Sequence, residues 1–270
     1  MRPTIPPADR SRLKSLLETY YTRYYRDTLG LPDWRTKVSS RLSEEDVESG
    51  RIPKVVEALG RPLAGLRVLN VGCGTGGFNA AAEQAGARTW GIDASDDAIR
   101  ICEVRRELGA GGRYAQAAAE ALPFPDGAFD VVYCLSTLEH VAEVEAAVAE
   151  MVRVLRPGGT VLLYAPNAWA LYENHYKIFW LPRCPRPLAR LYLRLRGRPA
   201  GFVDSLNYLS ARRCVRLFRR AGTTVAPFGL VRMDGPGSGW SGRLARLYYR
   251  ALRVKPAIQL MARKETAGRS

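Results

Sequence analysis

Val68-Leu-Asn-Val-Gly-Cys-Gly-Thr-Gly-Gly-Phe78 is the stretch that decides the fold, because an apolar strand runs here directly into a glycine-rich loop. Gly72, Gly74 and Gly76 allow a sharp turn and a close approach of the backbone to a ligand. A helix that begins after them would point its free amide groups at that ligand. Dinucleotide-binding enzymes use related loops, so this motif alone leaves open which ligand is bound.

Segments with strand and helix patterns alternate on both sides of this loop. Such alternation is typical of a parallel sheet that is covered on both faces. The predicted fold class is therefore α/β, a doubly wound, Rossmann-like, mostly parallel sheet that binds ligands beyond the carboxyl ends of its strands. We expect strands over residues 67–71, 89–92, 113–117, 130–134 and 160–165, and helices over residues 76–85, 95–108 (capped by Ser95) and 141–155.

An N-terminal helical extension and a basic C-terminal part flank this core. Residues 1–62 form the extension, in which we expect one helix over 10–25 and another that starts at Ser43 and ends at Gly60. Ser43 and Asp46 would form a capping box at that start. The main domain spans 63–270, with a basic, aromatic insertion around 167–209 that caps the sheet and a basic C-terminal helix. In its last part we expect a helix over 210–221, a strand over 223–228, a loop over 235–239, the basic helix over 242–254 and eight frayed final residues.

The formal net charge of +15 is concentrated towards the C-terminus. Residues 167–270 hold 21 basic and 4 acidic side chains, whereas residues 61–166 hold 9 basic and 13 acidic ones. A concentrated basic surface indicates an anionic partner, such as lipid headgroups, nucleic acid or a phosphorylated substrate.

Several protein classes are disfavoured by composition. The five cysteines, Cys73, Cys102, Cys134, Cys184 and Cys214, contain no CxxC pair, so we expect reduced, buried thiols rather than disulfides, and no metal site. No apolar run approaches the roughly 20 residues of a membrane-spanning helix. Residues 1–9 lack an apolar core, so we expect no secretory signal and a cytoplasmic location.

Further motifs follow the glycine-rich loop in a fixed order. Asp93 ends the second strand nineteen residues after Gly74, where a carboxylate can bind both ribose hydroxyls. Three later motifs are Ala119-Glu-Ala-Leu-Pro-Phe124 with Asp126-Gly-Ala-Phe-Asp-Val-Val132, then Leu138-Glu-His-Val141, then Leu155-Arg-Pro-Gly-Gly159. With these motifs, residues 63–166 resemble the class I S-adenosylmethionine-dependent methyltransferase family, in particular its small-molecule, lipid and quinone methyltransferases.

The resemblance implies S-adenosylmethionine as the cofactor and assigns roles to individual positions. The loop Gly72, Cys73, Gly74 and Gly76 would surround the methionine part, and Asp93 would hold the ribose. Ala94, Ala119 and Glu120 would contact the adenine, and the backbone carbonyl of Leu135 the ammonium group. Asn70 stands where the family usually has an acid, and it keeps a side chain that can form hydrogen bonds. Ala118 departs from the aspartate that many relatives use for the adenine amino group.

Methyl transfer from an activated sulfonium needs in-line positioning above all, and a hydroxyl acceptor must also lose its proton. His140 follows the fourth strand and His175 follows the fifth, so both are candidate catalytic bases. The alternative for His140 is a structural role in its loop. For His175 the alternative is a solvated connecting loop.

The acceptor is constrained only by the basic, aromatic segments. Segments 176–183, 188–196 and 243–253 interleave leucines and aromatic residues with arginine, and Leu16, Leu17, Tyr20, Tyr21, Tyr24 and Tyr25 lie in the first helix. Either these faces pack on the sheet, or they lie at an anionic membrane surface on the inner face of the membrane, with a small-molecule or lipid-like acceptor carrying a hydroxyl or an amine. Nucleic acid is the least favoured partner, because no separate binding module and no Asn/Asp-Pro-Pro-aromatic motif is recognisable. The sequence leaves the oligomeric state open.

Two other functions compete with a methyltransferase. An NAD(P)-dependent oxidoreductase would share the glycine-rich loop, but the later motifs are not expected in it. A non-catalytic binding module with a methyltransferase fold would not need the intact glycines and Asp93.

Overall fold

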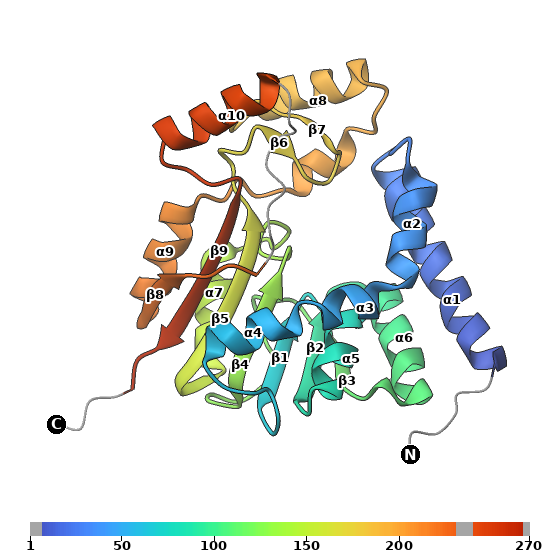
Figure 1. The fold of residues 1–270 in the computed structure, drawn as a ribbon, viewed down its shortest axis with the longest axis vertical. Coiled ribbons are helices and arrows are strands. Elements are labelled where there is room, and N and C mark those ends of the chain that lie inside the picture. Colours follow the sequence, from blue (N-terminus) through green and yellow to red (C-terminus); the bar gives the residue numbers. More distant parts are fainter. Residues whose placement is uncertain (1–6, 231–239, 267–270) are drawn as a thin grey trace.

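A seven-stranded sheet forms the centre of the computed structural model, which describes residues 7–230 and 240–266 (Figure 1). The strand order is β3-β2-β1-β4-β5-β9-β8. The five neighbours from β3 to β5 pair in parallel, whereas β9 is antiparallel to both β5 and β8. The strands are β1 (Arg67–Val71), β2 (Arg88–Asp93), β3 (Arg113–Gln116), β4 (Phe129–Leu135), β5 (Leu155–Pro166), β8 (Thr223–Pro227) and β9 (Ala257–Lys264). This architecture confirms the predicted mostly parallel, Rossmann-like sheet.

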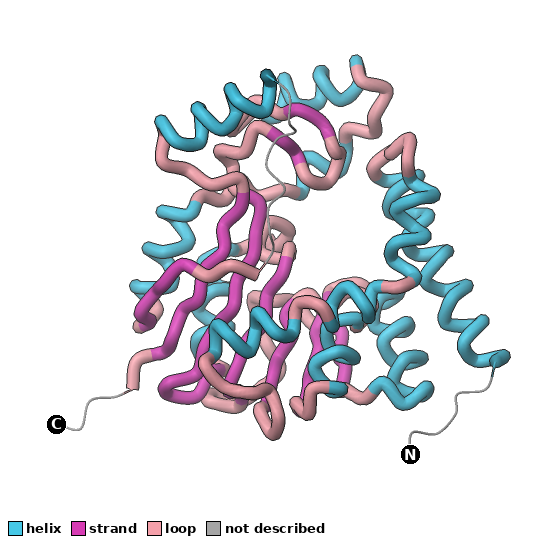
Figure 2. Tube along the Cα trace, in the orientation of Figure 1, coloured by secondary structure: helices cyan, strands magenta, loops and turns pink. Residues whose placement is uncertain are grey.

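The helices of the core cover both faces of the sheet (Figure 2). They are α4 (Ile52–Leu59), α5 (Gly77–Gln84), α6 (Asp96–Arg105), α7 (Val144–Arg153) and α9 (Ala211–Arg220), with the π-helical turn η2 (Arg106–Ala110) after α6. The Ser95 hydroxyl accepts the amide of Ala98 and so caps α6, as predicted.

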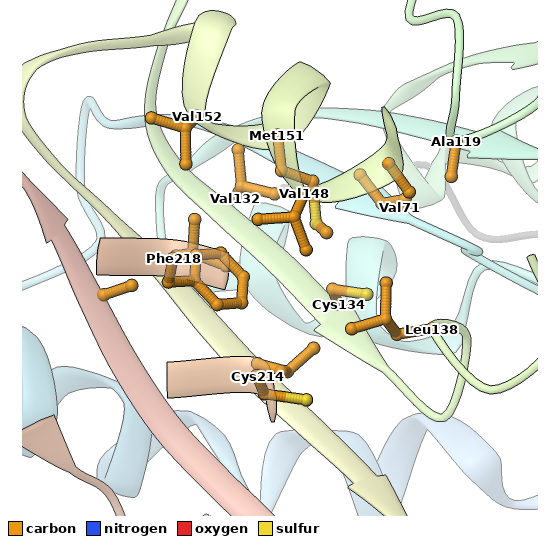
Figure 3. Packing of buried hydrophobic residues seen from close by; sticks show 14 of the residues in the cluster. Val71, Ala119, Val132, Cys134, Leu138, Val148, Met151, Val152, Cys214 and Phe218 are labelled. Carbon is orange, nitrogen blue, oxygen red and sulfur yellow. The ribbon is translucent and has the colours of Figure 1, made fainter. Parts of the chain in front are cut away.

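Side chains alternate between two cores along the central strands, as the period of two in a strand requires. In β4, Val132 and Cys134 point into the cluster formed with α7 and α9, which also contains Phe218 (Figure 3). Val131 and Tyr133 point to the opposite face, towards α4 and α5. Both faces of this strand are therefore buried, which explains its almost uninterrupted apolar sequence.

The N-terminal residues form more helices than the sequence indicated. The structure has α1 (Pro7–Thr22), the π-helical η1 (Arg23–Thr28), α2 (Trp34–Leu42) and α3 (Glu44–Ser49) before α4. The predicted capping box is wrong, because the Ser43 side chain makes no cap hydrogen bond. A side-chain cap needs an extended backbone, and Ser43 has φ −108° and ψ 30°. The division of the chain at residue 62 stays a prediction.

The C-terminal part adds a cap above the strand ends and completes the sheet. It contains a hairpin of β6 (Tyr172–Glu173) and β7 (Ile178–Phe179), then α8 (Arg186–Leu195), the 3-10 turn η3 (Gly201–Ser205) and α10 (Trp240–Ala251). The expected frayed end is wrong at Arg263 and Lys264, which lie in β9. The Lys264 ammonium donates to the carbonyls of Val152 and Leu155 and so holds the strand end in place. The loop expected over 235–239 lies outside the described residues.

Within the described residues, no helix is both long enough and apolar enough to span a bilayer.

Candidate active site

A cavity of about 810 Å³ opens at the carboxyl ends of β1, β2 and β4. The sheet edge forms one wall, and η1, α2, the β6–β7 turn and η3 contribute the others. All of the predicted site residues except Gly76 line it: Asn70, Gly72, Cys73, Gly74, Asp93, Ala94, Ala119, Glu120, Leu135, His140 and His175. The topology of the sheet therefore brings these predicted cofactor residues and both histidines together around one cavity.

The conformation of the glycine-rich loop depends on its glycines. Gly72 and Gly74 have φ of +71° and +52°, in the left-handed region that favours glycine. A Cβ on Gly72 would lie 2.1 Å from the Thr137 hydroxyl oxygen, whereas a Cβ on Gly74 would meet nothing within 4 Å. Gly74 thus faces open space where a ligand can approach the backbone. A Cβ on Gly76 would instead crowd Cys102 and Tyr114, so glycine is needed here for packing, and the cofactor contact of Gly76 stays a prediction.

Asp93 both shapes the loop and remains available to a ligand. One of its carboxylate oxygens accepts the amide of Gly74 at 2.9 Å, and the other accepts the amide of Ser95 at the same distance. Each carboxylate oxygen has two lone pairs, so acceptor capacity remains for two hydroxyl groups. Tyr20 borders the same space, and burial, followed by the nearby Asp93 charge, raises the pKa of its phenol to about 12.

Three predicted cofactor residues have structural partners in addition to their place in the cavity. The Asn70 amide nitrogen donates to Asn79 Oδ1 at 2.7 Å. One Glu120 carboxylate oxygen accepts the amides of Ala142 and Glu143, just before α7. The Leu135 carbonyl accepts the hydroxyl of Thr137 at 3.2 Å. The other Glu120 oxygen has no such backbone amide, and the adenine contact of Glu120 stays a prediction.

A buried ionic network ties the N-terminal helices to the glycine-rich loop. Glu44 accepts hydrogen bonds from the hydroxyls of Tyr21 and Thr75 and from the guanidinium of Arg105. Arg105 is 2% exposed and also donates through Nε to the carbonyl of Thr75 at 2.7 Å. Charges buried this deeply need partners to offset their lost hydration. The network positions α1 and α3 beside the site.

The two candidate histidines lie next to each other beside a buried acid. Their ring centroids are 5.2 Å apart, and Nε2 of His175 lies 3.9 Å from Oε1 of Glu139. The corresponding distance from Nε2 of His140 is 4.0 Å. Nδ1 of His175 is hydrogen-bonded to Glu173 at 2.7 Å, which orients the ring. Both carboxylate oxygens of Glu139 are buried, and neither has a hydrogen-bond partner among the described residues.

The pKa values of the three side chains in this cluster shift in different directions. Burial, reinforced by His175, lowers the pKa of His140 to about 4, so its imidazole is neutral near pH 7. Burial alone would also lower the pKa of His175, but the hydrogen bond and charge of Glu173 raise it above its usual value. Burial raises the pKa of Glu139 to about 7, although His175 opposes the shift. Near pH 7 the His140 imidazole is therefore neutral, whereas His175 holds a proton more readily than a free imidazole does.

Within the part of the chain that the structure describes, one group of side chains could hold a metal ion. Ligand atoms of Glu139, His140 and His175 all lie within 4.8 Å of one another. The expectation of no metal site was drawn from the cysteines alone, which carry no information about this group. It stays a prediction.

Several residues that line the cavity were not predicted as site residues. The aromatic side chains come from α1, η1, α5, β4, β5 and η3, and the cations are Arg41 of α2, Arg51 just before α4 and Lys177 of the β6–β7 turn. Tyr21 and Tyr25 stack at 5.9 Å, and Leu17, Tyr21 and Tyr25 are buried. Leu17, Tyr21 and Tyr25 are therefore packed inside the protein rather than exposed for contact with a membrane. Their helical spacing was visible in the sequence, but the partner against which they pack was not.

Comparisons with known proteins agree on one family. Residues 69–163 match the family model described as "Methyltransferase domain". The ubiquinone biosynthesis O-methyltransferase of Rhizobium etli is 34% identical over 178 residues, which cover 58% of this chain and 70% of that protein. The enzyme of the same description from Ralstonia nicotianae is 42% identical over 102 residues, which cover 37% of this chain and 43% of that protein. The chain spans about half the length of such curated relatives.

A solved structure supports the fold. The S-adenosylmethionine-dependent methyltransferase from Mesorhizobium loti aligns with a TM-score of 0.53 and 18% identity, covering 78% of this chain and 96% of that one. At this identity the likeness shows the fold alone, because one fold hosts many activities.

Proposed function

The chain belongs to the class I S-adenosylmethionine-dependent methyltransferase family, and we propose that it transfers the methyl group to a hydroxyl of a small-molecule or lipid-like acceptor. The observation that carries the proposal is the juxtaposition, in one cavity, of the glycine-rich loop, Asp93 and the His140–His175 pair. The curated relatives, which are O-methyltransferases of ubiquinone biosynthesis, favour a hydroxyl over an amine.

The residues of the sheet edge fit S-adenosylmethionine. Gly74 leaves open space at the backbone, and Asp93 retains lone pairs for two ribose hydroxyls. When bound, the cofactor supplies a methyl group on a sulfonium, which is already activated for transfer. The roles assigned to Asn70, Cys73, Ala94, Ala119, Glu120 and Leu135 are part of this proposal. The protein's contribution is then to align the acceptor and to exclude water.

His140 is the proposed proton acceptor. It lines the cavity and its imidazole is neutral near pH 7, the form that can take a proton from a hydroxyl. His175, held by Glu173, serves to position the acceptor and the neighbouring ring.

The acceptor is proposed to reach the cavity from the surface of an anionic membrane, which places the protein in the cytoplasm at the inner face of the membrane. α8 packs through Ala189 and Leu193 and leaves its other leucines in solvent, with Leu195 77% exposed. α10 leaves Leu247 62% exposed. These exposed leucines are Leu188, Leu191 and Leu195 on α8 and Leu244 and Leu247 on α10.

Both helices rest on the same segment of the cap. The Tyr248 hydroxyl of α10 donates to the carbonyl of Trp169, and Trp180 packs on Tyr192 of α8. The two helices lie at one end of the molecule, above the β6–β7 hairpin (Figure 1). Exposed leucines flanked by arginines are typical of helices that lie in a membrane interface.

Calorimetry and a methyl-transfer assay test the proposed reaction. We expect S-adenosylmethionine and S-adenosylhomocysteine to bind, NADH and NADPH not to bind, and labelled methyl to pass to phenolic acceptors. Binding of a nicotinamide cofactor would support the oxidoreductase. Binding of S-adenosylmethionine without transfer to any member of an acceptor panel would support the non-catalytic module.

Exchange of each histidine tests the catalytic assignment. We expect His140→Ala to lower kcat by about 100-fold or more, since a general base contributes on the order of 10²–10⁴. His140→Gln should be equally slow. In both variants the affinity for S-adenosylhomocysteine should be unchanged. If turnover survives both His140→Ala and His175→Ala, neither residue is the base.

Vesicle co-sedimentation tests the membrane surface. We expect the wild-type protein to sediment with vesicles that contain phosphatidylglycerol and to remain in solution with neutral vesicles. Replacement of Leu195 and Leu247 by glutamate should abolish sedimentation, whereas replacement of the exposed Val47 on α3 should not. Equal recovery in solution with both kinds of vesicle would rule out this surface.

A further inference from the structure

Two cations face the cavity without an acidic partner. The Nε group of Arg41 donates to the Tyr25 hydroxyl at 3.0 Å, and the guanidinium lies 5.5 Å from the centre of the Tyr21 ring. Within residues 7–230 and 240–266, no carboxylate forms an ion pair with Arg41 or with Lys177. The terminal nitrogens of Arg41 and the ammonium of Lys177 are therefore available to a ligand.

The acidic side chains around the cavity are already engaged. Glu44 is held by Tyr21, Thr75 and Arg105, and Glu48 pairs with Arg51. Asp93 and Glu120 accept backbone amides. Arg41 and Lys177 therefore interact with carboxylates only at longer range, Arg41 with Glu44 and Lys177 with Glu173 and Asp33. Cations that lack a direct ion-pair partner are suited to bind an anionic ligand.

Lys177 lies where a lysine is conformationally unfavourable. It is the last residue of the turn between β6 and β7, and its amide donates to the carbonyl of Glu173 at 2.9 Å. Its φ is +56°, in the left-handed region where glycine would be unstrained. Residues held in such conformations occur frequently at ligand sites, which fits a function for the ammonium.

The two cations also lie close enough to influence each other. Burial by the cavity walls and the neighbouring charges of Lys37 and Arg41 lower the pKa of Lys177, while Glu173 and Asp33 act in the opposite direction. Lys37 itself pairs with Asp33 at 3.4 Å. An anion between Arg41 and Lys177 would remove the repulsion between them.

We propose that Arg41 and Lys177 form an oxyanion subsite that binds a carboxylate or phosphate group of the methyl acceptor. The guanidinium offers a planar pair of donors that matches an oxyanion, and the ammonium adds a second charge from the β6–β7 turn. The subsite lies on the acceptor side, since Lys177 shares the hairpin turn with His175. This inference rests on the proposed methyl transfer and narrows its substrate class to anionic acceptors.

Simple probes test the subsite without knowledge of the acceptor. Benzoate, phenyl phosphate and the neutral benzyl alcohol are titrated into protein that is saturated with S-adenosylhomocysteine, with detection by ligand-observed NMR. We expect the wild-type protein to prefer the charged probes. Arg41→Met and Lys177→Gly should each lower the affinity for one or both of the charged probes by about tenfold or more, since a hydrogen bond to a charged group is lost. Benzyl alcohol should bind equally to all variants.

Matched variants separate binding from folding. Lys177→Gly relieves the left-handed strain, so its Tm should equal or exceed that of the wild type while anion binding falls. Arg35→Met removes the same charge from the same helix, but Arg35 does not line the cavity, and binding should not change. The proposal would be overturned if Arg41→Met and Lys177→Gly left the affinity for both charged probes unchanged. It would also be overturned if these variants lost as much affinity for benzyl alcohol as for the charged probes.

A further pair of titrations distinguishes the two sources of an oxyanion. S-adenosylhomocysteine carries a carboxylate, whereas 5′-methylthioadenosine does not. If Arg41→Met and Lys177→Gly lower the affinity for S-adenosylhomocysteine alone and leave the affinity for both charged probes unchanged, the subsite holds the carboxylate of the donor and the proposal is wrong. The charged probes are also titrated into protein without donor product. A wild-type protein that fails to bind S-adenosylhomocysteine would contradict the proposed function, while the probe titrations still decide the subsite.

Discussion

The two halves of the cavity are built in different ways. The half at the sheet edge is made from residues that follow β1 and β2 directly, and its loop is held by backbone contacts such as those of Gly72 and Gly74. The half that faces it is assembled from η1, α2, the β6–β7 turn and η3, which are far apart in the sequence. The first half is therefore readable as a motif, whereas the second exists only after folding.

The largest expected effect on ligand binding tests the half at the sheet edge. Gly72→Ala places a Cβ within 2.7 Å of three side-chain atoms of Thr137 and forces alanine into the left-handed region. Overpacking and strain together cost about 2–5 kcal/mol, so we expect affinity for S-adenosylhomocysteine to fall by at least about 30-fold. Isothermal calorimetry measures the change.

Two further variants isolate the cause of that loss. Gly60→Ala carries the same left-handed penalty without a contact, so it should destabilise the fold slightly and leave binding unchanged. Adding Thr137→Gly to Gly72→Ala should restore part of the affinity. If Gly72→Ala alone binds normally, the loop does not approach the ligand closely.

The next effect concerns the link between the two halves. Arg105→Met leaves Glu44 buried without its cation, and removing one partner of a buried ion pair costs about 3–5 kcal/mol. We expect urea unfolding to show this loss and hydrogen exchange to show faster opening of residues 7–49. The exposed Arg100, which pairs with Asp96, provides the control, since Arg100→Met should change stability by less than about 1 kcal/mol. A small effect of Arg105→Met would mean that the N-terminal helices are held mainly by apolar packing.

The smallest expected effect depends on pH and concerns the acceptor half. In the folded protein the pKa of Glu139 is raised from 4.5 to about 7, so the folded state retains a proton that the unfolded state loses. The resulting stabilisation is fully present below pH 4.5 and is lost as the pH rises through about 7. Glu139→Gln stays neutral. We therefore expect the stability of this variant relative to the wild type to increase by about 2–3 kcal/mol between pH 5 and pH 9.

Urea unfolding at several pH values measures this difference. The exposed Glu143→Gln variant serves as the control, and its stability relative to the wild type should not change with pH. A constant difference for Glu139→Gln between pH 5 and pH 9 would show that Glu139 has a partner when ionised.

Some elements were missed for identifiable reasons. No strand was expected over β9, and its last two residues were expected to be frayed. Only Ile258, Leu260 and Ala262 carry its apolar alternation, and its pairing with β5 and β8 is a long-range contact. α2 has a single fully buried residue, Val38, so its sequence carries a weak periodic signal. The short hairpin of β6 and β7 has two residues in each strand, too few for a pattern.

The sequence by itself determined the parallel core, the glycine-rich loop and Asp93, since each depends on local periodicity or on a backbone conformation that only glycine adopts without strain. It also identified both histidines, because they follow strands that end at the same edge of the sheet. Only the tertiary structure decided that Tyr21 and Glu44 clamp the loop, that Glu139 lies beside both imidazoles, and that Arg41 and Lys177 face one cavity. These groups meet through long-range packing, and no local pattern in a sequence encodes which distant side chains become neighbours.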